Sequence, residues 1–213
     1  MAPLPPSADA WLRLFLMGGA ASVLGSLSAL MLWVRSPLST GEGRDVEQPI
    51  ELDHRHHVRD DGIDCLYCHR AALRSPYAGL PSTELCMGCH GQVWNRSSET
   101  APLRRSWAEM RPIHWRRVHD LGDFVFFDHR AHLDAGVGCE SCHGRVDRMA
   151  HVHQSESLRM SFCLDCHRDP IPHLRDRDQL TVMGLAPDRA RGRRIADARG
   201  GVSPPTHCTG CHR

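Results

Sequence analysis

Five copies of one pentapeptide constrain this chain more than any other feature of its sequence. Each copy has the form Cys-x-x-Cys-His, and no cysteine lies outside the five copies. This is the spacing of covalent c-type haem attachment, in which two thiols bind the porphyrin vinyl groups and the adjacent histidine ligates the iron. The predicted attachment pairs are Cys65 and Cys68, Cys86 and Cys89, Cys139 and Cys142, Cys163 and Cys166, and Cys208 and Cys211. The sequence therefore predicts five haem c groups, with proximal ligands His69, His90, His143, His167 and His212.

Two other uses of paired cysteines compete with haem attachment. Cys-x-x-Cys also occurs in zinc ribbons and in thioredoxin-like redox sites. A histidine directly after every pair is not required by either of these. All ten thiols are used by the five motifs, so none is left for a disulfide or an iron-sulfur cluster.

The composition indicates a thin protein core. Aromatic residues make up only 6% of the 213 residues, and there are 14 Pro and 18 Gly. Small cores need help from bound groups, so five flat apolar macrocycles are expected to supply much of the interior. We expect a mostly α and irregular fold: short helices around the motifs, long loops and little strand, with a haem-cored domain.

The charged residues exclude some functions. The 26 basic residues are all arginine and face 25 acidic ones, which gives a net charge of +1. The arginine fork suits bidentate pairing with carboxylates, so some arginines could bind haem propionates, although a biased genome explains the composition equally well. Without lysine, no haem can have a lysine ligand. Basic and acidic residues alternate and aromatic platforms are few, so we expect no nucleic-acid partner.

A charge-free run of 21 residues lies near the N-terminus, from Leu14 to Val34. As a helix it would be about 31 Å long, close to the hydrocarbon thickness of a bilayer. Trp11 and Arg13 precede it and Trp33 and Arg35 follow it, as interfacial anchors do. A cleaved signal peptide is disfavoured because the run is too long and no small-residue cleavage site closes it.

We therefore predict a single-pass anchor over residues 1–35, in the cytoplasmic (inner) membrane. Small residues recur every fourth position in this run, which suggests packing against another membrane subunit, although such residues are also common in transmembrane helices. Because haem is attached to this motif outside the cytoplasm, the rest of the chain is expected on the periplasmic side. A polar linker is predicted at 36–50 and a pentahaem domain at 51–213.

The haem domain contains an internal repeat. The segments LDHRHHVRDDGIDCLYCH and FDHRAHLDAGVGCESCH both have an Asp-His pair, a second histidine three residues later, and a haem motif soon after. We divide the domain into a first dihaem half (51–100), a second dihaem half (101–175) and a C-terminal haem segment (176–213).

The repeat is the best indication of the distal ligands. Histidines three apart lie on successive helical turns, so they can serve two different irons. The stretch resembles the class III multihaem cytochromes of the c3 and c7 type, which give the first histidine to the nearest haem and the second to a neighbour. By that resemblance His54 ligates the first haem and His129 the third, while His57 and His132 reach neighbouring haems. The alternative is that these are surface or propionate-bonded histidines.

Other distal candidates are weaker. Between the two halves lie His114 and His119, of which we prefer His119. Met160 lies three residues before Cys163; a thioether ligand would raise the potential of one haem, and otherwise Met160 fills a gap in the core. The spare candidates are His151, His153, His173, His207 and Met149.

The order of parts resembles the membrane-anchored pentahaem cytochrome c subunit of alternative complex III, a quinol-oxidising respiratory complex. The resemblance covers nearly the whole chain. It lies in the single apolar helix, the five motifs and the run IHWRRVHDLGDFVFFDHRAHLDAGVGCESCHGRVDRM that leads to LRMSFCLDCHR. It implies a position beside an iron-sulfur subunit, quinol-binding membrane subunits and a monohaem cytochrome c.

The predicted function is electron transfer from menaquinol oxidation to a periplasmic cytochrome or an oxidase, with no substrate transformed on this chain. One alternative is a stand-alone membrane-anchored quinol dehydrogenase that feeds a periplasmic reductase. About 30 residues separate the apolar run from the first motif, which disfavours it. A second alternative, an enzyme that reduces nitrite or hydroxylamine, needs an iron with an open or unusual axial position. All five motifs end in histidine, which disfavours that reading.

Overall fold

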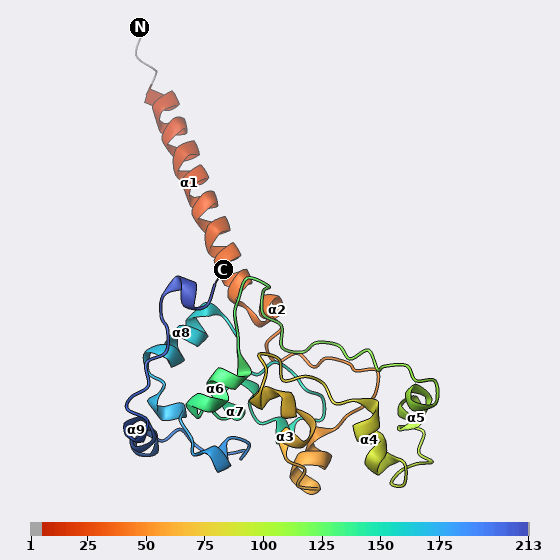
Figure 1. The fold of residues 1–213 in the computed structure, drawn as a ribbon. Coiled ribbons are helices and arrows are strands. Elements are labelled where there is room, and N and C mark those ends of the chain that lie inside the picture. The colour runs from red at the N-terminus through yellow and green to blue at the C-terminus, as the bar shows by residue number, and fades with distance from the viewer. Residues whose placement is uncertain (1–5, 213) are drawn as a thin grey trace. The chain divides into compact units, whose positions relative to one another are not determined.

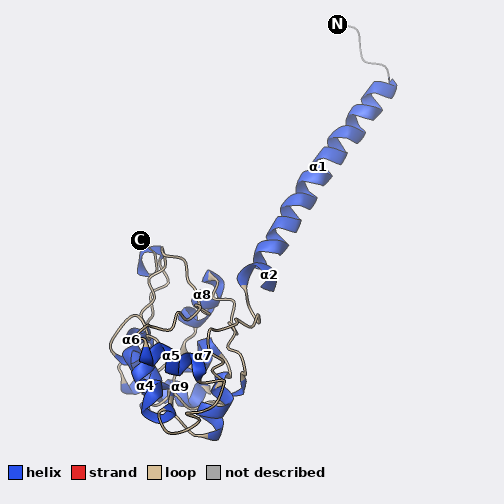
Figure 2. Cartoon of the chain, turned by 90° about the vertical axis from the view of Figure 1, so that its right-hand side faces the viewer, coloured by secondary structure: helices blue, strands red, loops and turns tan. Residues whose placement is uncertain are grey.

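The computed structural model describes residues 6–212, and these are helical or irregular. No strand occurs within this range, and the β-type pairings there are isolated bridges, such as that between Val137 and Leu174. Short helices joined by long loops follow one long N-terminal helix (Figure 2). The predicted fold class is therefore confirmed. The chain divides into two units between Glu42 and Gly43.

The first unit consists of helix α1 (Pro6–Arg35) and helix α2 (Pro37–Thr40), seen at the red end of the ribbon in Figure 1. At 1.5 Å per residue, the 30 residues of α1 extend about 45 Å. The helix is long and apolar enough to cross a membrane, and its large apolar side chains are exposed within this unit. Helix α2 ends at Gly41, whose φ of 74° places it in the left-handed region where glycine is favoured. The predicted linker thus begins with a short helix.

The second unit is built from short elements (Figure 1). Its α-helices are α3 (Cys65–Cys68), α4 (Thr83–His90), α5 (Ala101–Ala108), α6 (His129–Ala135), α7 (Glu140–His143), α8 (Met160–Arg168) and α9 (Arg189–Ala198). A π-helical turn, η1 (Arg55–Asp60), precedes α3. The 3-10 turns are η2 (Arg70–Leu73), η3 (Val146–Arg148), η4 (Ile171–His173), η5 (Arg177–Gln179) and η6 (Cys208–Gly210).

Polar caps fix where several of these short helices begin. The Asp128 carboxylate accepts backbone hydrogen bonds from Arg130 and Ala131 at the start of α6. Ser82 and Asp188 cap α4 and α9 in the same way. Each cap satisfies N–H groups that the first helical turn leaves without partners. Helices of seven to ten residues are marginal alone, so these caps and tertiary contacts hold them.

The apolar core of the second unit is small. The buried apolar residues among those described are Ala72, Leu103, Leu133, Met149, Leu174, Leu180, Ile195 and Ala196. Six of them form two clusters. Ala72, Leu133 and Leu180 cluster where α6 packs on η2, and Leu174, Ile195 and Ala196 cluster where α9 packs on η4. Eight buried side chains are few for a unit of this length, which agrees with the expected thin core.

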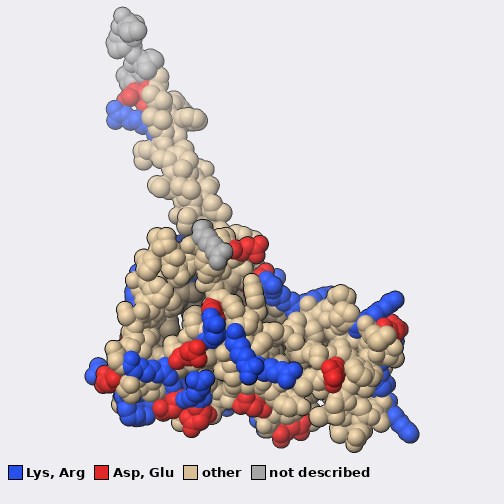
Figure 3. All heavy atoms as spheres, viewed as in Figure 1, with Lys and Arg blue, Asp and Glu red and all other residues tan. Residues whose placement is uncertain are grey.

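A buried arginine ties the segment after α8 to the third haem motif. Only 4% of Arg175 is exposed. Its guanidinium donates to the carbonyls of Val182 and Leu185 at 2.7 and 3.0 Å and to the Glu140 carboxylate at 3.1 Å. A buried charge is stable only when its donors are satisfied in this manner. On the surface, arginines and acidic residues are intermingled on the face that Figure 3 shows.

Candidate haem attachment sites

All five motifs fold into a helical turn, and we call them sites 1 to 5 in chain order: residues 65–69, 86–90, 139–143, 163–167 and 208–212. They lie in α3, α4, α7, α8 and η6 or directly beside them. In a helical turn, positions i, i+3 and i+4 share one face, so the turn presents both thiols and the histidine to the same side. The ten cysteines are all free of disulfide bonds. The local structure therefore presents the atoms that haem attachment requires.

Four of the five proximal histidines are held by a backbone carbonyl. The Nδ1 atoms of His69, His90, His167 and His212 donate to the carbonyls of Gly79, Val93, Pro205 and Phe124 at 3.0, 3.2, 2.7 and 3.3 Å. A carbonyl oxygen only accepts, so Nδ1 carries the proton and Nε2 keeps the lone pair. This second bond is the usual way in which a protein orients a metal-ligating histidine.

The second histidine of each repeat makes the same bond within its own turn. His57 Nδ1 donates to the Asp53 carbonyl at 2.9 Å, and His132 Nδ1 donates to the Asp128 carbonyl at 2.8 Å. In both cases the acceptor is four residues earlier, although one turn is π-helical and the other α-helical. The repeat seen in the sequence is thus also a repeat in side-chain geometry, and it presents Nε2 as the ligating atom.

Three of the predicted distal histidines face a proximal histidine at the distance that a shared iron would require. Imidazole nitrogens bind metals at about 2.0 Å, and the ring centre lies about 1.1 Å beyond Nε2. Two imidazoles on opposite sides of one metal ion would therefore have ring centres about 6.3 Å apart. The ring centres of His57 and His90 are 6.1 Å apart. Those of His132 and His167 are 6.0 Å apart, and those of His129 and His143 are 6.3 Å apart with nearly parallel planes.

His54 and His119 have buried ring nitrogens without a hydrogen-bond partner among the described residues. These atoms are His54 Nδ1 and His119 Nε2. A buried polar atom without a partner costs free energy, so we expect each of these two nitrogens to contact a bound group. His119 lies beside His143 with ring centres 4.3 Å apart, which is too close for both rings to bind opposite sides of one iron. His119 as a distal ligand stays a prediction.

Burial favours the neutral form of four candidate ligand histidines, His54, His119, His132 and His143. Burial, with smaller effects from His119 and His129, lowers the pKa of His143 to about 3. Burial and the neighbouring His69 lower the pKa of His54 to about 4. Burial also lowers the pKa of His132 and His119. Only the neutral imidazole has a lone pair for a metal, so burial favours the ligating form at neutral pH.

Other histidines pair with carboxylates. The Nδ1 atoms of His151 and His153 lie 3.2 and 3.1 Å from Glu51 and Asp45. His56 lies 3.5 Å from Asp61 and stacks on Trp94. Met160 is 64% exposed at the first position of α8, and its role as a ligand stays a prediction.

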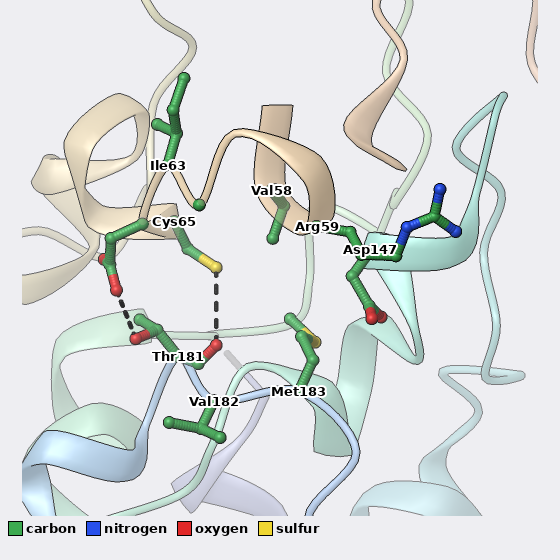
Figure 4. A pocket seen from close by; sticks show the side chains of 10 residues that line it. Val58, Arg59, Ile63, Cys65, Asp147, Thr181, Val182 and Met183 are labelled. Atoms are coloured by element: carbon green, nitrogen blue, oxygen red, sulfur yellow. Dashed lines mark hydrogen bonds between the residues drawn. The ribbon is translucent and has the colours of Figure 1, made fainter. Parts of the chain in front are cut away.

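A cavity of about 230 Å³ adjoins site 1 (Figure 4). Its walls include Cys65, Ile63 and Val58 from the first repeat, and Val182 and Met183 from the segment after η5. Cys65 faces the Thr181 carbonyl across it, with Sγ and O 4.0 Å apart. The cavity has apolar side chains next to an attachment thiol, and Arg59, Asp64 and Asp147 also line it. Together, thiols, neutral histidines and spacing fit haem c.

The structure adds functional groups that sequence reasoning did not predict. The carbonyls of Gly79, Val93 and Pro205 orient proximal histidines, but a carbonyl occurs in every residue and carries no sequence signal. Phe127 stacks on His132 with ring centres 4.6 Å apart and meets His129 edge-on at 4.7 Å. Its position two residues before the histidine pair was the only available signal.

No protein-family model matches the chain. Over 125 residues the chain is 38% identical to the multiheme cytochrome c subunit of menaquinone reductase from Nitratidesulfovibrio vulgaris. The matched region covers 58% of this chain and 52% of that protein, so the chain spans about half the length of this relative.

Proposed function

We propose that this chain is a membrane-anchored pentahaem c-type cytochrome that transfers electrons as a subunit of a quinol-oxidising respiratory complex, alternative complex III. One observation carries the electron-transfer role: three candidate distal histidines stand 6.0–6.3 Å from proximal histidines, the spacing of two imidazoles on one iron. The resemblance described under Sequence analysis supports the assignment to this complex. When bound, each haem supplies an iron that exchanges one electron. An iron with two histidine ligands has no open position for a substrate, which favours electron transfer over catalysis on this chain.

The protein's contribution is to fix the ligands. Backbone carbonyls hold the imidazoles in one tautomer and one orientation, so little rearrangement accompanies a change of charge at the iron. The apolar helix α1 keeps the chain at the membrane with the haem domain on the periplasmic side, where haem is attached. The proposed partners are an iron-sulfur subunit, quinol-binding membrane subunits and a monohaem cytochrome c.

A second candidate follows from the relative, which is a subunit of a menaquinone reductase. In this alternative, the same haem chain receives electrons and delivers them towards menaquinone. Two histidine ligands on each iron are compatible with electron flow either from menaquinol or towards menaquinone. The composition of the assembly and the direction of electron flow therefore distinguish the two candidates.

The test is a haem-stained native gel of gently solubilised membranes, with mass spectrometry of the band that contains this chain. We expect a large assembly with an iron-sulfur protein, multi-span membrane subunits and a second cytochrome c. Added menaquinol should reduce the haems of that assembly. A chain that runs alone or with one soluble reductase would refute the proposal, and menaquinone reduction without menaquinol oxidation would favour the second candidate.

A further inference from the structure

The contacts among the five motifs define an order in space that differs from their order in the sequence. We propose that the haem sites form a single unbranched row in the order 2, 1, 3, 4, 5, with sites 2 and 5 at its ends and site 3 at its centre. This inference rests on the proposed function, since it assumes that all five motifs carry haem. Four separate connections between neighbouring sites support this order.

Sites 2 and 1 are joined by the π-helical turn η1 and its cap. His57 of this turn stands 6.1 Å from His90 of site 2, whereas His54 at the N-terminal end of the turn lies near His69 of site 1. Because His54 and His57 are one turn apart, their two partners must be neighbours.

Sites 1 and 3 are joined by the packing of helix α6 on η2, the turn directly after site 1. His129 of α6 faces His143 of site 3 and donates from Nδ1 to the Pro76 carbonyl at 2.7 Å, in the loop that follows η2. Leu66 and Cys139, one from each motif, pack against the same buried cluster. Cys65 and Cys139, one attachment cysteine from each site, also lie close to each other.

Sites 3 and 4 are joined by α6 itself. His129 faces site 3 while His132, one turn later, faces His167 of site 4 at 6.0 Å. Helix α6 therefore connects sites 3 and 4 through two histidines one turn apart, as η1 and its cap connect sites 1 and 2.

Sites 4 and 5 are joined by the segment that leads into the last motif. His167 of site 4 donates from Nδ1 to the Pro205 carbonyl at 2.7 Å, three residues before Cys208. Gly210 of site 5 packs on Pro205 so closely that an added Cβ would lie 2.6 Å from its ring.

The exposure of the attachment cysteines supports sites 2 and 5 as the two ends of the row. The two exposed cysteines among the ten are Cys89 of site 2 and Cys208 of site 5. At the centre, the His143 ring is enclosed by His119 and His129. Electron donors and acceptors can therefore approach the row at sites 2 and 5, while site 3 is reached through its neighbours. If the motifs were instead arranged in sequence order, site 1 rather than site 2 would be an end.

The test compares His57→Met with His54→Met in the haem-loaded full chain. Each variant marks one haem, site 2 or site 1, because a thioether ligand raises the potential of its iron. Neighbouring haems interact electrostatically, so the potential of each adjacent haem shifts as well. A redox titration followed by NMR of the individual haems should show one shifted neighbour for His57→Met and two for His54→Met.

Two shifted neighbours for His57→Met, or one for His54→Met, would overturn the order. If either variant loses its haem, the iron–iron distances in a structure of the unsubstituted haem-loaded chain decide. Site 2 must then have site 1, and not site 3, as its nearest neighbour. These results are independent of the native gel, so the row can fail while membership of the complex stands, and the reverse also holds.

Discussion

Replacing His132 by alanine provides a direct test of the ligand geometry. His132 and His167 have ring centres 6.0 Å apart, and Asp128 fixes the His132 ring through its carbonyl. Alanine removes one axial imidazole at site 4 only. The two thiols of that site still hold the haem covalently, so the haem content should not change. One of five irons, about 20% of the total, should change from low spin to high spin.

The assay combines two measurements on the purified, oxidised protein. Intact mass reports the number of attached haems, and electron paramagnetic resonance counts high-spin iron. His56→Ala is the matched control, because His56 belongs to a repeat but is exposed and stacks on Trp94. The control should keep all five irons low spin. An unchanged spin count in His132→Ala would refute the ligand assignment, and a high-spin signal of the same size in the control would refute the reasoning from ring spacing.

Two further predictions concern stability, measured by chemical unfolding of the haem-loaded protein. Asp147 is buried against Arg145, which lowers the pKa of the Asp147 carboxyl below 3.8. Asp147→Asn should therefore lower the free energy of unfolding by about 1.5–3 kcal/mol at neutral pH. The difference from the unsubstituted chain should shrink as the pH falls below 3.8, because the carboxylate becomes protonated. A difference that does not change with pH would exclude this ion pair as its cause. Gly192→Ala should cost about 1–3 kcal/mol, because the added Cβ would lie 1.7 Å from the Ile171 carbonyl oxygen. Arg193→Ala, exposed on the same helix, should change stability by less than about 0.5 kcal/mol, and an equal loss in both variants would contradict the packing argument.

Several parts of the fold were predictable because they depend on local sequence. The charge-free run from Leu14 to Val34 predicted a long helix, and the structure places α1 at Pro6–Arg35. The low aromatic content predicted a thin core, and few apolar residues are buried. The division of the haem domain at residues 100 and 175 stays a prediction, and so do the periplasmic topology and the binding of five haems.

The histidine pairs show where sequence reasoning stopped. The repeat predicted that His54, His57, His129 and His132 are ligands, but it could not say which haem the second histidine of each pair reaches. The structure places His57 opposite His90 and His132 opposite His167. Each partner lies more than 30 residues away along the chain. Loops without a periodic pattern connect them, so their path cannot be read from residue types.

The sequence by itself determined the chemistry of this protein: the thiol pairs, the adjacent histidines and the apolar helix each follow from residue types at short, fixed spacings. The tertiary structure alone decided the relation between the motifs. Carbonyls such as those of Pro76 and Pro205, which have no side-chain signature, orient histidines from other parts of the chain. The turn η1 and the helix α6 then join sites pairwise, because histidines one turn apart must reach two neighbouring partners.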